Sequence, residues 1–331
     1  MSDNGLLEFD AISNAFQHSK EIIEQLRVDF IKALLDSPHR EKITIVTTGS
    51  YGRGEASKSS DLDLFLFFDS DRSDDNLEQE KKNIKEVVDK YIAKQPGDTG
   101  TFGANVVVKF SEMLKNLGGE NDLNNLLTRR MLFLLEGTWL YGESRFKSYR
   151  AELITKYIKA GDPERQISRF LLNDIIRYYR TITTDFEYKV SESMKSWGLR
   201  NVKLRFSRKL LYFGGVISVA ETALMPQAEK NASLASLFDK TVLERVQDIG
   251  ANNRYTAEIL SIYQGFLQTI ECPDKRSELD SVTKEGRSSS PLFVQMREKS
   301  KEFSIVLDNW LREQYPNIEG TPHPIHNALL F

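Results

Sequence analysis

The sequence predicts an α/β (α+β) domain with a mixed sheet over residues 1–150, followed by an all-α helical-bundle domain over residues 151–331. Short apolar runs rich in β-branched and aromatic residues, typical of buried strands, occur in the first part at 43–46, 62–68 and 105–110. Longer amphipathic patterns with helical spacing fill the second part. A chain of 331 residues is long for one hydrophobic core, so two domains are the natural expectation.

The order of the elements in the first domain follows from the same patterns. Apolar residues at helical spacing over 6–35 predict a helix that leads into the first strand. The acidic stretch 69–80 after the second strand is interpreted as a solvated loop that opens a helix over 77–92. Glycine-containing turns bracket the third strand. From residue 121 onward helical runs replace the strand pattern, and the boundary is placed near residue 150.

In the second domain, amphipathic helices are predicted over 166–190, 202–224, 234–250, 255–271 and 291–315. The polar stretch 271–291 contains Gly and Ser and predicts a surface loop, and the tail from residue 321 has no regular pattern.

Composition excludes several classes of protein. The hydrophobic fraction of 40% argues against disorder, and a single cysteine excludes an internal disulfide and a zinc cluster built on cysteines. No run approaches the roughly 18 apolar residues that a membrane span needs, and the N-terminus lacks a signal-peptide pattern. A cytoplasmic protein without membrane partners is therefore expected. The sequence does not indicate an oligomeric state.

One stretch carries the functional signal. Gly49 and Ser50 follow the first strand-like run, where a glycine lets backbone N–H groups approach an anion. Asp61 and Asp63 stand at the start of the next run, and residues i and i+2 of a strand point to one face. Two converging carboxylates repel each other unless a cation lies between them, and Mg²⁺ favours carboxylates combined with substrate phosphates. The stretch therefore predicts a Mg-nucleotide site, for which Mn²⁺ is the alternative metal.

The strings Gly-Ser, Arg-Gly and Ser-Asp-Leu-Asp-Leu, in this order within residues 49–64, resemble the signature of the DNA polymerase β-like nucleotidyltransferase superfamily. Their amino-acid sequence most resembles the corresponding motif of the uridylyltransferases that modify PII signalling proteins. The resemblance implies that Asp61 and Asp63 are catalytic and bind the metal, and that Gly49 and Ser50 hold the triphosphate.

Two further assignments depend on that resemblance and leave alternatives open. Arg53 faces either the phosphates, the favoured reading, or an acid on a neighbouring helix. The superfamily's third carboxylate would be Asp98, which precedes Lys109 by a similar distance, or Glu112, or would be absent. Either acid is equally explained as a loop or helix-cap residue.

A basic segment over residues 195–212 contains no acid, although the net charge of the whole chain is −3. By the same resemblance, Lys203, Arg205 and Arg208 are expected to contact the triphosphate. The alternative is a solvated basic helix face.

The predicted function is transfer of a nucleoside monophosphate from Mg-NTP to an acceptor hydroxyl, with release of pyrophosphate. A single concentrated basic segment does not provide an extended nucleic-acid track, so the expected acceptor is a protein or a small RNA. A synthase of cyclic or linear oligonucleotides is the alternative enzyme. A catalytically silent nucleotide-binding or antitoxin-like protein is the alternative outside enzymes. The phosphate-binding signature does not encode the base of the NTP.

Overall fold

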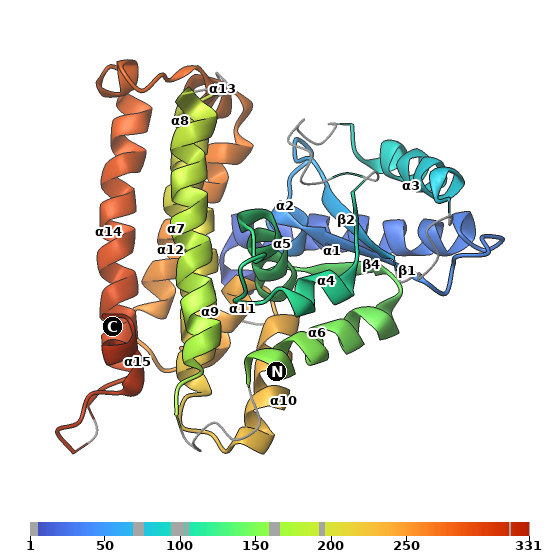
Figure 1. Ribbon diagram of the computed structural model, residues 1–331. Helices are drawn as coiled ribbons and strands as arrows, with labels where there is room; N and C mark the ends of the chain where they lie inside the picture. Colours follow the sequence, from blue (N-terminus) through green and yellow to red (C-terminus); the bar gives the residue numbers. More distant parts are fainter. Residues whose placement is uncertain are drawn as a thin grey trace. The chain divides into compact units, whose positions relative to one another are not determined.

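The computed structural model describes residues 6–68, 76–93, 103, 106–158, 166–191, 196–317 and 319–330 (Figure 1). The chain divides into two compact units, one of residues 14–157 and the other of residues 1–13 together with 158–331. Each unit is described below by itself.

The unit of residues 14–157 is built around a four-stranded sheet with the order β3-β2-β1-β4. Strand β1 (Ile43–Thr48) pairs antiparallel with β2 (Asp63–Phe68) and with β4 (Thr138–Tyr141), whereas β2 pairs parallel with β3 (Val107–Val108). The sheet is therefore mixed, as the sequence predicts. Strand β4 is a correction, because it lies in a region where only helical runs were expected; a four-residue strand is too short to show alternation.

Helices cover both faces of this sheet, and their bounds are α1 (Asp10–Ala33), α2 (Gly49–Gly52), α3 (Glu78–Tyr91), α4 (Phe110–Lys115), α5 (Asn124–Leu135) and α6 (Glu143–Tyr157). Alternate residues of β2 point to opposite faces. Leu64 and Leu66 belong to the core that β2 shares with α1 and α3. Phe67 packs edge-on against Phe133 of α5 and Tyr149 of α6, and Figure 1 shows α4, α5 and α6 around this side of the strands.

The predicted domain boundary at residue 150 lies inside α6. This helix continues to Tyr157 because Leu153, Ile154 and Tyr157 are buried, and the Tyr157 hydroxyl accepts a hydrogen bond from Arg130 Nε at 2.7 Å. The compact unit accordingly ends at Tyr157. The division into a catalytic domain and a separately folding helical domain stays a prediction.

In the described residues of the other unit the regular elements are helices: η1 (Leu6–Glu8), α7 (Arg169–Ser191), α8 (Gly198–Lys203), η2 (Leu204–Arg208), α9 (Lys209–Glu221), α10 (Gln227–Asp239), α11 (Val242–Ile249), α12 (Thr256–Glu271), α13 (Pro273–Ser281), η3 (Gly286–Ser288), α14 (Pro291–Gln314) and α15 (Pro324–Ala328). Elements α8, η2 and α9 follow one another without a break, and η2 is a π-helical turn. The described part of the chain has no helix long and apolar enough to cross a membrane.

Three predictions for this unit were wrong in detail. The helix expected over 234–250 is two helices, α10 and α11, because Thr241 starts a new helix with a capping box to Glu244. The loop expected over 271–291 contains α13, which has proline in its first turn and a fully buried Leu279 that anchors it. The tail contains the short helix α15, anchored by the buried Ile325.

Candidate active site

The glycine turn and the aspartate pair meet at one end of the sheet. Strand register places Thr48 opposite Asp63, so Gly49 starts α2 directly beside this aspartate. Gly49 has φ +69°, and a Cβ built on it would lie 2.5 Å from Asp63 Oδ2. Only glycine tolerates both the backbone conformation and this approach. The backbone of the turn is thereby held against the carboxylate that the sequence assigned to metal binding.

The negative charge of Asp61 also affects a residue of the turn. Asp61 and Asp63 are half-buried; Asp63 starts β2, and Asp61 lies two residues before it in the preceding loop. Tyr51, in the second position after Gly49, is buried; its burial and the negative charge of Asp61 raise the pKa of its phenol to about 12. The structure thus brings both carboxylates close to the residues of α2.

Ser50 offers the turn a free hydroxyl. Its side chain is half-buried, and among the described residues its hydroxyl has no hydrogen-bond partner. The loop that follows is fixed, because the Ala56 N–H donates to Ser19 Oγ of α1 at 2.9 Å. An available hydroxyl on a fixed turn is suited to binding a phosphate oxygen.

Arg53 faces acids, the second of its two predicted alternatives. Its side chain is only 8% exposed and donates to Glu55 Oε2 at 2.8 Å and to Glu136 Oε2 at 2.5 Å. Glu136, which directly follows α5, has a side chain with 0% exposure. Its other oxygen accepts the Gly49 N–H at 2.8 Å. Glu136 therefore ties the arginine to the first residue of the turn.

Glu136 is a site residue that the sequence analysis missed. Its contact with Gly49 joins residues 87 positions apart, and no local sequence motif predicts it. The available signal was an acid followed by Gly137 at the end of an apolar run. A carboxylate at such a place has to find a buried cation.

Comparison with known families agrees with this geometry. Residues 27–108 match the model of the nucleotidyltransferase domain family. These residues form a nucleotidyltransferase domain. The match includes the last part of α1, the glycine turn, both aspartates and β3. No curated protein matches the chain significantly.

The residues of the nucleotidyltransferase domain fit a divalent cation only in part. Asp61 and Asp63 supply hard oxygen ligands, and Gly49 lets the backbone of the turn lie close to Asp63 Oδ2. The described residues contain no group of three or more acids, histidines or cysteines that could hold a metal by themselves. Two carboxylates are too few to hold Mg²⁺ alone, and this ion usually completes its coordination with water and substrate phosphates.

The third carboxylate stays a prediction. Asp98 lies outside the described residues. Glu112 is exposed in the first turn of α4, where an acid is also explained by the positive end of a helix.

The predicted cations belong to the helical unit. Lys203 ends α8, whereas Arg205 and Arg208 lie in η2, and all three side chains are half-buried. Their contact with the triphosphate stays a prediction.

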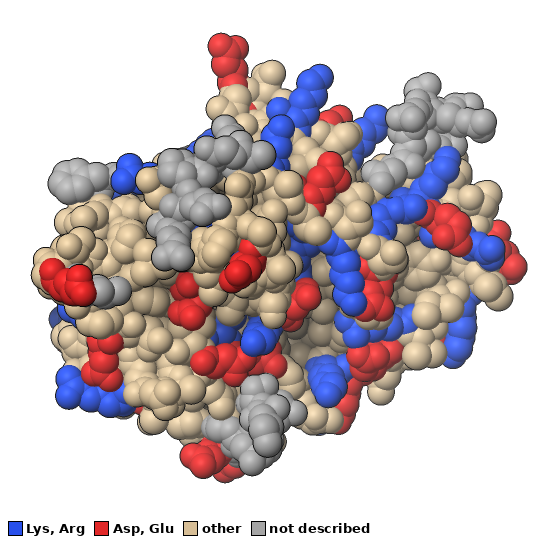
Figure 2. All heavy atoms as spheres, turned by 90° about the horizontal axis from the view of Figure 1, so that it is seen from below, with Lys and Arg blue, Asp and Glu red and all other residues tan. Residues whose placement is uncertain are grey.

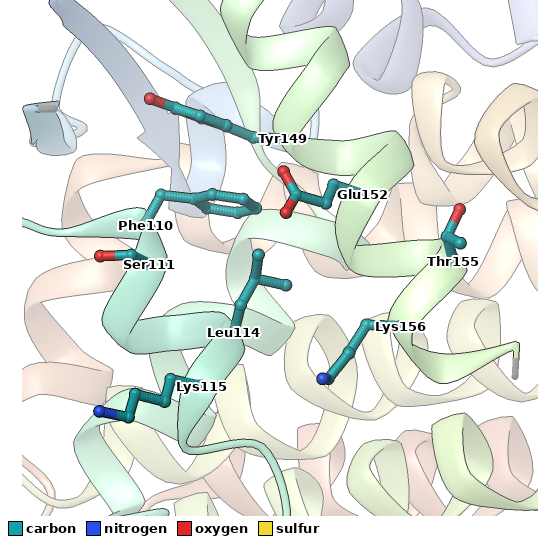
Figure 3. Close-up of a pocket in the computed structure, with 8 residues that line it drawn as sticks. All are labelled: Phe110, Ser111, Leu114, Lys115, Tyr149, Glu152, Thr155 and Lys156. Carbon is teal, nitrogen blue, oxygen red and sulfur yellow. The ribbon is translucent and has the colours of Figure 1, made fainter.

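A pocket of about 620 Å³ lies between α4 and α6 of the sheet-containing unit (Figure 3). Its floor includes the stacked rings of Phe110 and Tyr149, whose centroids are 4.1 Å apart, and Lys115 and Lys156 stand at its rim. The residues of the glycine turn and the two aspartates are not among those that line it. It is therefore a feature separate from the candidate active site.

Replacing Gly49 with alanine should lower nucleotidyl transfer about tenfold or more, because the new methyl group displaces the Asp63 carboxylate. The positive φ adds a stability cost of roughly 1–2 kcal/mol. The matched control is Gly265→Ala in α12, where a Cβ meets nothing within 4 Å. Initial rates at saturating NTP, together with thermal melts of both variants, test this. A Gly49→Ala protein with wild-type rate would show that Asp63 need not keep its position.

Proposed function

We infer that the chain is an active nucleotidyltransferase that moves a nucleoside monophosphate from an NTP to an acceptor hydroxyl. The single observation that carries this inference is the contact between Gly49 and Asp63, which unites the turn and the aspartate pair within a matched nucleotidyltransferase domain.

The reaction is a displacement at phosphorus. The acceptor oxygen bonds to the α-phosphorus, the bond from that phosphorus to the oxygen bridging to the β-phosphate breaks, and pyrophosphate leaves with the electron pair. The acceptor's proton passes to a base, for which Asp98 is the predicted residue. Such chemistry depends mainly on positioning and on charge stabilisation.

The residues of the proposed site would have distinct roles. Ser50 would donate its hydroxyl to a phosphate oxygen, while Glu136 would position the turn by accepting the Gly49 N–H and pairing with Arg53. Asp61 and Asp63 would hold Mg²⁺ or Mn²⁺, which neutralises charge on the phosphates and stabilises the attacking and leaving oxygens. Lys203, Arg205 and Arg208 are proposed to add positive charge from the helical unit.

The proposed acceptor is a protein hydroxyl or the end of a small RNA. On the face shown in Figure 2, basic and acidic side chains are interspersed over the described residues, without a continuous basic band. A long nucleic acid requires many phosphate contacts along a track. The pattern on this face supports an acceptor held by few phosphates or by none.

The test is incubation of the full-length chain with each of the four NTPs, labelled at the α-phosphate, and with Mg²⁺ or Mn²⁺, in a cell extract depleted of small molecules. We expect label in a protein or a small RNA and release of unlabelled pyrophosphate. Label in a cyclic or linear dinucleotide would favour the synthase instead. Absence of transfer with all four NTPs and both metals, in extract and with purified RNA and protein pools, would contradict an enzymatic role.

A further inference from the structure

Thr48, the last residue of β1, has a buried hydroxyl without a hydrogen-bond partner. The residue is 0% exposed, and among the described residues nothing donates to its Oγ1 or accepts from it. A threonine just before a helix ordinarily uses this oxygen to accept an N–H of the first turn. Thr48 directly precedes α2, yet its side chain makes no such bond. The hydroxyl is therefore used neither by the strand nor by the helix.

The register of the sheet places this hydroxyl on the same face as the Asp63 carboxylate. Thr48 and Asp63 are directly opposite each other in the ladder between β1 and β2. Side chains of directly opposite residues point to one face, with their Cβ atoms about 4.5–5.5 Å apart. This face is the one that α5 and α6 cover, because Phe67, on the same side of β2 as Asp63, packs against Phe133 and Tyr149.

Burial alone does not distinguish Thr48. Thr44, on the same face of β1, is also 0% exposed and has an unpaired hydroxyl, but the residue opposite it is Phe67, whose side chain offers no acceptor. A buried hydroxyl without a partner is costly, and valine has the same shape without that cost. Only Thr48 of these two threonines faces a carboxylate that the proposed reaction uses.

The Asp63 carboxylate lies between this threonine and the turn. A Cβ built on Gly49, the residue after Thr48, would lie 2.5 Å from Asp63 Oδ2. A carboxylate has lone pairs for several partners, so one that binds a cation still accepts a hydrogen bond from a neighbouring donor. Carboxylate ligands of metals commonly depend on such outer hydrogen bonds for their orientation.

We propose that Thr48 is a positioning residue for Asp63: its hydroxyl donates to the Asp63 carboxylate and orients it when this aspartate holds a divalent cation. The inference rests on the metal site of the proposed function. The threonine acts through the aspartate and touches neither the cation nor the substrate. Its effect is therefore expected in the affinity for the metal, and not in the stability of the metal-free chain.

The test is titration of Mn²⁺ into the full chain without NTP, followed through the electron paramagnetic resonance signal of free Mn²⁺. Thr48→Val keeps the shape and removes only the donor. We expect it to bind Mn²⁺ about tenfold more weakly, the scale typical of outer partners of metal ligands, with a metal-free melting temperature no lower than that of the wild type. Thr48→Ser keeps a hydroxyl and should bind close to the wild type.

The matched control is Thr44→Val, which removes an equally buried, unpaired hydroxyl from the same face of the same strand and should bind Mn²⁺ like the wild type. In an Asp63→Asn background, Thr48→Val should cause no further loss of affinity, because the carboxylate that it positions is gone. If Thr48→Val does not fold, Thr48→Ala compared with Thr48→Ser decides, since these two variants differ only in the hydroxyl.

Wild-type Mn²⁺ affinity in Thr48→Val overturns the proposal, as does an equal loss in Thr44→Val or equal Mn²⁺ binding by the wild type and Asp63→Asn. The labelling assay judges the proposed function separately. Nucleotidyl transfer by a chain whose Mn²⁺ affinity does not depend on Thr48 would overturn this inference alone. A Mn²⁺ affinity that depends on both Thr48 and Asp63, in a chain without transfer, would support the inference and contradict the enzymatic role.

Discussion

Asp63→Asn and Asp61→Asn should each abolish nucleotidyl transfer while the protein stays folded. Each substitution keeps the shape of the side chain and removes a negative charge from the proposed metal site. The expected loss in rate is on the order of 10²–10⁴-fold, the scale found for a key electrostatic group. Transfer of labelled nucleotide under single-turnover conditions measures it directly.

The surroundings of each aspartate support this expectation. Asp63 lies against the Gly49 backbone, and Asp61 acts on the buried Tyr51 phenol, so neither is an ordinary surface acid. Asp308→Asn makes the same chemical change at an exposed carboxylate paired with Arg312 and should leave the rate unchanged. If Asp63→Asn transfers nucleotide at the wild-type rate with an unchanged melting temperature, the carboxylate has no role in binding the metal.

The two aspartates also show how much of the site was readable from sequence. A period of two in a strand predicts that Asp61 and Asp63 share a face, and a glycine after a strand-like run identifies the turn. Both are local sequence rules. The observed pairing of Thr48 with Asp63 brings the glycine turn next to this aspartate. The mixed sheet was predictable for the same reason, because its three longer apolar runs are each a local pattern.

What could not be predicted depends on contacts between distant parts of the chain. Glu136 meets Gly49 and Arg53 only after α5 has packed on the sheet, so its role has no local signature. The direction of Arg53 was open for the same reason: the motif fixes its position and leaves its partner undetermined. Likewise, α13 forms in a polar stretch because one buried leucine, Leu279, gains from tertiary packing that local propensity does not describe.

The second large effect that we expect is a loss of stability when Glu136 is replaced. Glu136→Ala would leave the Gly49 N–H without its acceptor and the buried Arg53 with one fewer carboxylate. Removing one partner of a buried ion pair costs about 3–5 kcal/mol, because an uncompensated charge remains in a site of low polarity. Urea denaturation of the full chain should show this loss as a lower midpoint. The exposed pair of Glu143 with Lys147 provides the control, since Glu143→Ala should cost no more than about 1 kcal/mol.

Glu136→Gln separates the two contributions of this carboxylate. The glutamine keeps an oxygen that accepts the Gly49 N–H, whereas its amide group no longer neutralises Arg53. We therefore expect stability between those of the wild type and Glu136→Ala, and, at a temperature where both variants are folded, faster transfer by Glu136→Gln than by Glu136→Ala. Equal transfer rates in the two variants would mean that the hydrogen bond to Gly49 does not position the turn. A Glu136→Ala protein as stable as the wild type would mean that the buried arginine is neutralised by Glu55 alone.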